Sequence, residues 1–173
     1  KSRLLVLGDY ARQHGIKLSI RPENNVPIDT SSTTRISQAV AEIEACAFLA
    51  TALGYGVKKL DFSIVTTLES SDARTNIKAV YSQLTLTSKA MLVIANTATT
   101  DIEVVADIAE KFHLGIVLDV HAHWVRTGSY ITMKHPCIER IKESWSPLDP
   151  TLIYANSNKE VLAQAGHECS LSR

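Results

Sequence analysis

The sequence predicts an α/β protein built on a parallel β-sheet. Short apolar segments alternate with amphipathic segments whose apolar residues recur every three or four positions, and this alternation is typical of repeated β-then-α units. The clearest strand lies in Gly115–Trp124, GIVLDVHAHW, where four apolar residues run directly into polar side chains. A chain of 173 residues has the length of one domain and can bury a hydrophobic core.

The first half of the chain predicts three helices and two strands. An opening helix ends before Gly15, a residue favoured just after helices. A strand rich in isoleucine follows it, and a turn-rich loop leads to a long amphipathic helix. The expected elements are helices at Ser2–His14, Arg35–Leu53 and Asp72–Leu86 and strands at Ile16–Pro22 and Val57–Val65.

The second half continues the same alternation. The strand at Ala90–Ala95 is wholly apolar, which predicts burial on both faces. Two capping boxes, TDIE and SNKE, each mark the start of a helix. The expected elements are strands at Ala90–Ala95, Gly115–His121 and Thr151–Ala155 and helices at Thr100–Phe112, His135–Trp145 and Asn158–Ala165.

These elements make one helix followed by five β-then-α units. Such an order implies parallel strands joined by right-handed crossovers. A complete (β/α)8 barrel needs about 250 residues, so the chain supplies part of a barrel or forms an open, doubly wound sheet. The dinucleotide-binding version of the open sheet is disfavoured, because no GxGxxG motif follows any predicted strand.

The composition excludes several classes of protein. Eighteen basic and 18 acidic residues balance to a net charge of zero, so no overall field attracts nucleic acid or an acidic membrane. Apolar runs are too short to span a bilayer. Cys46, Cys137 and Cys169 are odd in number and lack metal-ligand spacing, which favours reduced thiols in an intracellular, cytoplasmic or nuclear, compartment. The sequence contains no P-loop, nucleophile elbow, HExxH or CxxC motif.

Asp119, His121 and His123 are the strongest candidate site residues. They follow a buried strand at its carboxyl end, where α/β proteins keep their chemistry. Strand alternation would point all three to one side, unless the strand ends earlier and the following segment re-aims them. A carboxylate and two imidazoles at this spacing can bind a divalent metal. The alternative is a structural Asp that caps a loop beside two half-exposed histidines.

The order of several motifs resembles the UV damage endonuclease family, a metal-dependent TIM barrel of the xylose-isomerase-like superfamily. The matching stretches are LGDYARQHGIKLSIRPEN, GIVLDVHAHW and TLIYANSN with AGHE after it. The resemblance covers nearly all of residues 1–173 as a single domain. It implies a partial (β/α)8 TIM barrel of about five units, with outer helices, that lacks the first two units and the last. It also implies damaged double-stranded DNA as the partner and manganese or zinc as the metal, if the family's site is retained.

The resemblance also implies that most metal ligands are replaced. The family's His-Pro-Gly-Gln word is aligned with Arg21-Pro22-Glu23-Asn24, its next histidine with Asp61, and its Glu-Asn-Asp word with Ala95-Asn96-Thr97. Ala122 interrupts the usual run of histidines, and Leu152 and Tyr154 stand at a Lys-x-His word. By this alignment, Asp119 and His167 still match metal ligands of the family, and His121 and His123 are further candidate ligands. We therefore expect no tightly bound metal and assign no catalytic residue.

Two further expectations concern charged residues near this site. Arg21 and Asp61 would lie at the carboxyl ends of adjacent strands and pair across the space that the metals occupied. A one-residue shift in register would instead leave both charges in solvent. Arg126 and Lys134, in or beside the loop after Gly115–His121, are candidate phosphate contacts.

Three functions fit these observations. The first is a diverged, weakly active or inactive relative of the DNA-repair family. The second is a scaffold that uses the barrel as a structural module, with a protein partner completing it. The third is an active metal-dependent endonuclease whose site is completed by residues outside the chain. The zero net charge favours the scaffold modestly over the two DNA-binding functions.

Overall fold

The computed structural model describes residues 2–22, 27–56, 58–68, 73–146, 148 and 152–153. Five strands alternate with seven helices within these ranges. The strands are β1 (Ser19–Ile20), β2 (Ser63–Thr67), β3 (Leu92–Ala95), β4 (Gly115–Asp119) and β5 (Leu152–Ile153). The helices are α1 (Arg3–Gln13), α2 (Thr33–Ala52), α3 (Ala73–Tyr81), α4 (Leu86–Met91), α5 (Ile102–Phe112), α6 (Val120–Thr127) and α7 (Cys137–Trp145).

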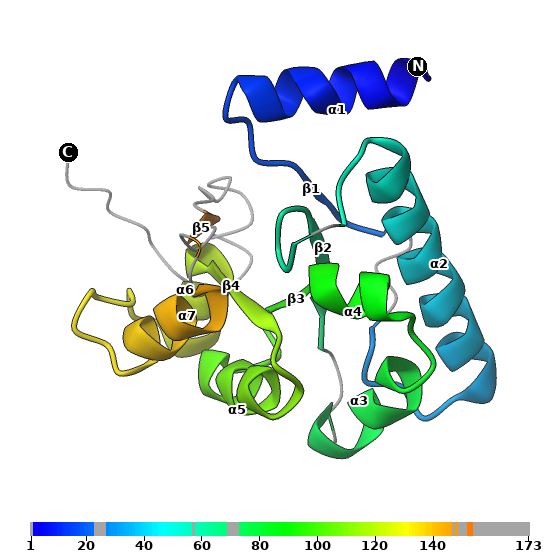
Figure 1. Cartoon of the computed structure of the whole chain (residues 1–173). Helices are drawn as coiled ribbons and strands as arrows, with labels where there is room; N and C mark the ends of the chain where they lie inside the picture. The colour runs from blue at the N-terminus through cyan, green and yellow to red at the C-terminus, as the bar shows by residue number, and fades with distance from the viewer. Residues whose placement is uncertain are drawn as a thin grey trace, which may run out of the picture.

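All strand pairs are parallel, and the strands lie in the order β1-β2-β3-β4-β5. Each strand therefore lies beside the strand that precedes it in the chain, without the reversal that defines a doubly wound sheet. Right-handed crossovers that always move in one direction place their helices on one face of the sheet. Figure 1 shows α2, α3, α5 and α7 arranged around the outside of the strands. This arrangement confirms the predicted α/β fold and is that of a partial TIM barrel.

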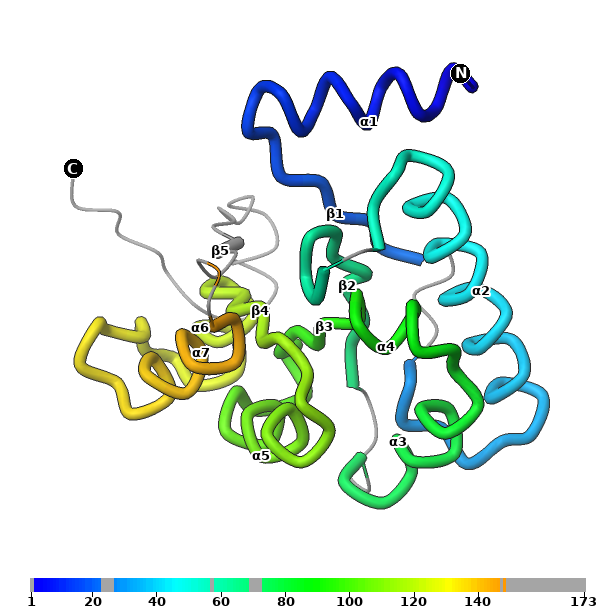
Figure 2. The backbone as a smooth tube through the Cα atoms, viewed as in Figure 1, coloured from blue at the N-terminus to red at the C-terminus, as the bar shows by residue number. Residues whose placement is uncertain are grey.

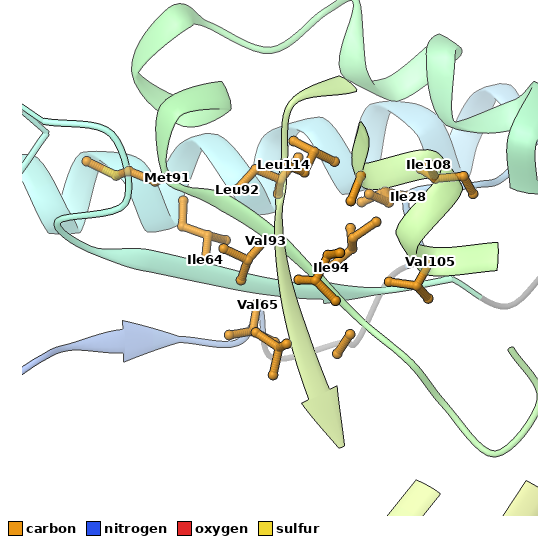
Figure 3. Packing of buried hydrophobic residues seen from close by; sticks show 14 of the residues in the cluster. Ile28, Ile64, Val65, Met91, Leu92, Val93, Ile94, Val105, Ile108 and Leu114 are labelled. Atoms are coloured by element: carbon orange, nitrogen blue, oxygen red, sulfur yellow. The ribbon is translucent and has the colours of Figure 1, made fainter. Parts of the chain in front are cut away.

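The core lies between this sheet and its helices. Strand residues Ile64, Leu92, Ile94 and Ile116 are almost wholly inaccessible to solvent, and Figure 3 shows the first three among residues of α5 and of the connections. Val93 and Gly115 are register partners on one face of the sheet. A Cβ added to Gly115 would lie 2.9 Å from Cγ1 of Val93, so the glycine leaves room for this valine.

The second strand begins later than the sequence predicts. Leu60 has φ of 60°, which an L residue does not adopt within a strand, and its N–H donates to the carbonyl of Ala90. Asp61 follows in a bend, and β2 starts at Ser63. The predicted strand Val57–Val65 is therefore wrong in its first half.

One predicted crossover helix is divided into two. Helix α3 ends at Tyr81, and Thr85 then caps a new helix, α4, by accepting a hydrogen bond from the N–H of Ser88 at 3.2 Å. The hydroxyl and N–H of Thr85 both donate to the carboxylate of Glu44 in α2. This contact fixes the turn between α3 and α4 against the long helix.

Helix α1 lies apart from the sheet, as the tube in Figure 2 shows. At Gly8, α1 packs directly against the end of α2, because an added Cβ would lie 1.7 Å from the carbonyl oxygen of Leu53. Arg12 binds the same carbonyl through Nη1 at 2.9 Å and pairs with Asp9. The opposite side of α1 carries the exposed residues Val6, Leu7 and Tyr10.

The two cysteines within the described residues are free and buried, and burial raises the pKa of both thiols. These are Cys46 in α2 and Cys137 in α7, whereas Cys169 lies outside the described residues. Among the described residues, no helix is long and apolar enough to cross a membrane. The predicted helix Asn158–Ala165 also lies outside the described part of the chain.

Candidate functional site at the carboxyl ends of the strands

The candidate site is the edge of the sheet where the parallel strands end. Arg21 follows β1, Thr67 ends β2, Ala95 ends β3 and Asp119 ends β4. Leu152 lies in β5, where its backbone pairs with Leu118 beside the end of β4. The structure thus places Arg21, Ala95, Asp119 and Leu152 in or directly after neighbouring strands. Asn24, Tyr154 and His167 lie outside the described residues.

Asp61 does not belong to this edge, which corrects the prediction. In the β1–β2 register, Ser19 lies beside Ser63, so Arg21 lies beside Val65, whereas Asp61 precedes β2. Four residue steps separate Asp61 from Val65, which corresponds to at most about 13 Å along the strand direction. The carboxylate of Asp61 instead accepts hydrogen bonds from the N–H groups of Gly56 and Lys58. The expected Arg21–Asp61 pair is therefore wrong.

Asp119 forms the junction between β4 and α6. Its Oδ1 accepts a hydrogen bond from the N–H of Ala122 at 2.9 Å and caps the helix. Its backbone is held by the buried side chain of Asn96, which accepts from the N–H of Asp119 at 2.8 Å and donates to its carbonyl at 2.9 Å. The side-chain amide of Asn96 thus continues the hydrogen bonding between β3 and β4 beyond the last backbone pair. Asp119 therefore acts as a capping carboxylate, but it caps a helix, where the structural alternative expected a loop.

The two histidines do not share one side with each other. The strand ends at Asp119 and α6 starts at Val120, so strand alternation stops before His121. Residues two positions apart on an α-helix point about 200° apart. His121 stacks on Trp124, with 6.2 Å between ring centroids, whereas His123 is buried 5.9 Å from the ring of His135. The expectation that both histidines point to the side of Asp119 through strand alternation is wrong.

The environment of His123 disfavours its charged form. Burial is the main cause that lowers its pKa, the nearby His135 lowers it further, and Asp101 acts in the opposite direction. A neutral imidazole in the protein interior is a stable arrangement. His123 therefore serves the packing between α6 and the start of α7.

The donors at this edge do not fit a metal of the expected kind. The described part of the chain contains no group of three or more His, Cys, Asp or Glu side chains that could hold a metal ion. Arg21 brings positive charge to the edge, and Ala95 has no donor atom. A site for two or three ions requires about four or more carboxylate and imidazole ligands. The described residues alone do not supply this set.

Sequence reasoning missed three polar residues near the same edge. Asn96, described above, directly follows a wholly apolar strand, and this position is the signal that could have identified it. Asp29 is buried in the connection between β1 and α2, next to Ile28, whose N–H donates to the carbonyl of Thr67. The hydroxyl of Thr67 is buried and has no hydrogen-bond partner among the described residues.

The two candidate phosphate contacts differ in their surroundings. Arg126 donates to the carbonyl of Thr99 at 2.9 Å and lies 3.4 Å from the carboxylate of Asp101. These contacts tie the end of α6 to the start of α5 and neutralise part of the charge of Arg126. Lys134 is exposed in the connection between α6 and α7.

The consecutive parallel strands, outer helices and polar residues at the strand ends define a TIM-barrel-like class of protein. The structure is similar to the solved structure described as "Crystal Structure of SacUVDE", a UV damage endonuclease, with a TM-score of 0.74 and 15% sequence identity. The similarity covers 90% of this chain and 53% of that chain, so this chain spans about half of the enzyme's length. No family model and no curated protein matches the sequence. The likeness shows the fold.

Proposed function

We propose that the chain is a diverged UV-damage-endonuclease-like domain that binds DNA without cleaving it by metal-dependent hydrolysis. One observation carries this proposal: the carboxylate of Asp119 caps α6, while Arg21 follows β1 and the next two strands end in Thr67 and Ala95. The resemblance to SacUVDE supports the DNA-repair fold. The replacement of ligands supports the loss of cleavage, because too few donors remain to hold two or three ions and activate water.

The metal content of the purified, untagged full chain tests the proposal. After dialysis against manganese and zinc, elemental analysis is expected to find well below one equivalent of either metal. A supercoiled, UV-irradiated plasmid is expected to stay uncut but to shift in a binding assay. Two or more metal equivalents together with nicking would overturn the proposal and favour an active endonuclease whose ligands come from residues outside the described set.

A second candidate function is a scaffold or interaction module. The exposed Val6, Leu7 and Tyr10 on α1 favour it, because apolar residues that gather on one helix side often mark a protein interface. Sedimentation of the full chain separates the two candidates. Self-association that Leu7→Glu abolishes, without any DNA binding, would favour the scaffold over the first proposal.

A further inference from the structure

Three rings form a stacked series that starts at the end of β4. His121 stacks on Trp124 with an interplanar angle of 23°, and Trp124 stacks on Tyr130 with an angle of 26° and 6.1 Å between centroids. Trp124 is 8% exposed, whereas Tyr130 is 57% exposed. The series therefore leads from the buried side of α6 to the surface and ends on an accessible aromatic ring.

The surroundings of Tyr130 combine apolar and positive groups. Tyr130 lies in the connection between α6 and α7, which extends away from the strands at the left of Figures 1 and 2. Met133, in the same connection, is 75% exposed, and Lys134 next to it is exposed. The chain carries no acidic residue between Asp119 and Glu139, although its overall charge is balanced. The carboxylate of Asp101, which precedes α5, lies beside this stretch and is paired with Arg126.

We propose that Tyr130, supported from behind by Trp124, is a stacking platform for an unpaired nucleobase of single-stranded DNA. An aromatic ring held in a stack loses little conformational freedom on binding and can accept the face of any base. Lys134, which is exposed in the same connection, is the basic residue that would contact the phosphate beside that base. Stacking on an aromatic ring adds to the affinity that basic side chains provide through the phosphates. A base paired within a duplex cannot offer its face to the ring.

This inference rests on the DNA-binding half of the proposed function and adds the form of nucleic acid that is bound. Fluorescence anisotropy of the full chain with a labelled oligothymidine of about 12 nucleotides tests it, since single-strand-binding folds cover sites of this size. A duplex of the same length is the comparison probe. The single strand is expected to bind more tightly than the duplex.

Three variants identify the role of the ring. Tyr130→Ala is expected to weaken single-strand binding about 5- to 150-fold, which corresponds to the loss of one base–aromatic stack. Tyr130→Phe keeps the ring and is expected to bind like the wild type. Phe48→Ala is the matched control, because Phe48 on α2 is an aromatic residue that is 77% exposed. Its affinity is expected to stay unchanged, and the thermal midpoints of all variants show whether each remains folded.

The outcomes separate this inference from the proposed function. If the single strand binds and Tyr130→Ala changes nothing, or Phe48→Ala weakens binding equally, DNA binding stands and the platform is refuted. If neither probe binds, both the platform and the DNA-binding function are refuted. If the duplex binds as tightly as the single strand to every variant, the platform is likewise refuted.

Discussion

At the scale of single residues, the carboxylate of Asp119 determines how the chain passes from β4 into α6. Asp119 could in principle hold a metal or cap a helix, and in this structure its Oδ1 accepts the hydrogen bond from Ala122. The side chain of Asn96 holds the backbone of Asp119 on the other side. Together these contacts form a strand-to-helix junction that is complete without a ligand.

Replacement of Asp119 by Ala is expected to lower the free energy of unfolding by about 0.5–2 kcal/mol, because the N–H of Ala122 loses its acceptor. Asp119→Asn keeps a capping oxygen and is expected to stay close to the wild type. Urea unfolding at neutral pH measures both, with and without a chelator. A large loss in Asp119→Asn that depends on added metal would contradict the capping role.

His123 is expected to make the stability of the fold depend on pH. Its pKa is lowered in the folded protein, so the unfolded chain takes up a proton first as the pH falls. The stability contributed by the neutral imidazole is complete above the ordinary pKa of 6.5 and is lost as the pH falls toward the lowered pKa.

Urea unfolding between about pH 7.5 and about pH 5.5, a range that brackets the ordinary histidine pKa, measures this effect. The wild type is expected to lose more stability across the range than His123→Gln. Equal slopes for the wild type and His123→Gln would refute the assignment.

At the scale of elements, the outer helices are joined by ion pairs, whereas α1 is joined to the carbonyl of Leu53 by the close approach of Gly8 and by a hydrogen bond from Arg12. Arg140 of α7 binds Asp107 at 2.8 Å and Glu110 at 2.5 Å, both in α5, and Arg74 of α3 also binds Asp107. These contacts lower the pKa of Asp107 and Glu110, mainly through their hydrogen bonds to Arg140. No comparable network of ion pairs joins α1 to the sheet within the described ranges.

Gly8→Ala is expected to detach α1 from the end of α2. Alanine favours an isolated helix by about 1 kcal/mol over glycine, but its Cβ would overlap the carbonyl oxygen of Leu53. The clash is expected to outweigh this preference and to cost about 1–3 kcal/mol, unless α1 moves away. Hydrogen exchange of the α1 amides measures the result. Slower exchange in α1 of Gly8→Ala than in the wild type would contradict the close approach.

At the scale of the whole molecule, the alternation of strands and helices was predictable from the sequence, because each element must bury an apolar face with its own period. The start of β2 was not predictable, since Leu60 and Asp61 continue a strand-like pattern while the backbone turns through a positive φ. The position of Asp119 at the carboxyl end of β4 was predictable. The directions of His121 and His123 were not predictable, because they depend on helix α6. No glycine or proline in the sequence marks the start of this helix.

Native-state hydrogen exchange of the whole chain is expected to divide it into regions of different stability. The buried strands β2, β3 and β4 should exchange slowest, since their residues form the centre of the core, and α1 should exchange fastest among the helices. Mass spectrometry of peptides after timed labelling measures this order. Protection of α1 equal to that of β3 would show that α1 belongs to the same cooperative unit.

The consecutive order of the strands also has a consequence for synthesis on the ribosome. Each strand pairs with the one made just before it, so no strand must wait for a distant part of the chain to emerge. Parallel pairing is slow, because each pair closes a loop that contains a whole crossover, but none of these loops is longer than one β-then-α unit. The strands from β1 to β4 can therefore assemble in the order of translation, with each new unit covering the edge that the previous unit left open.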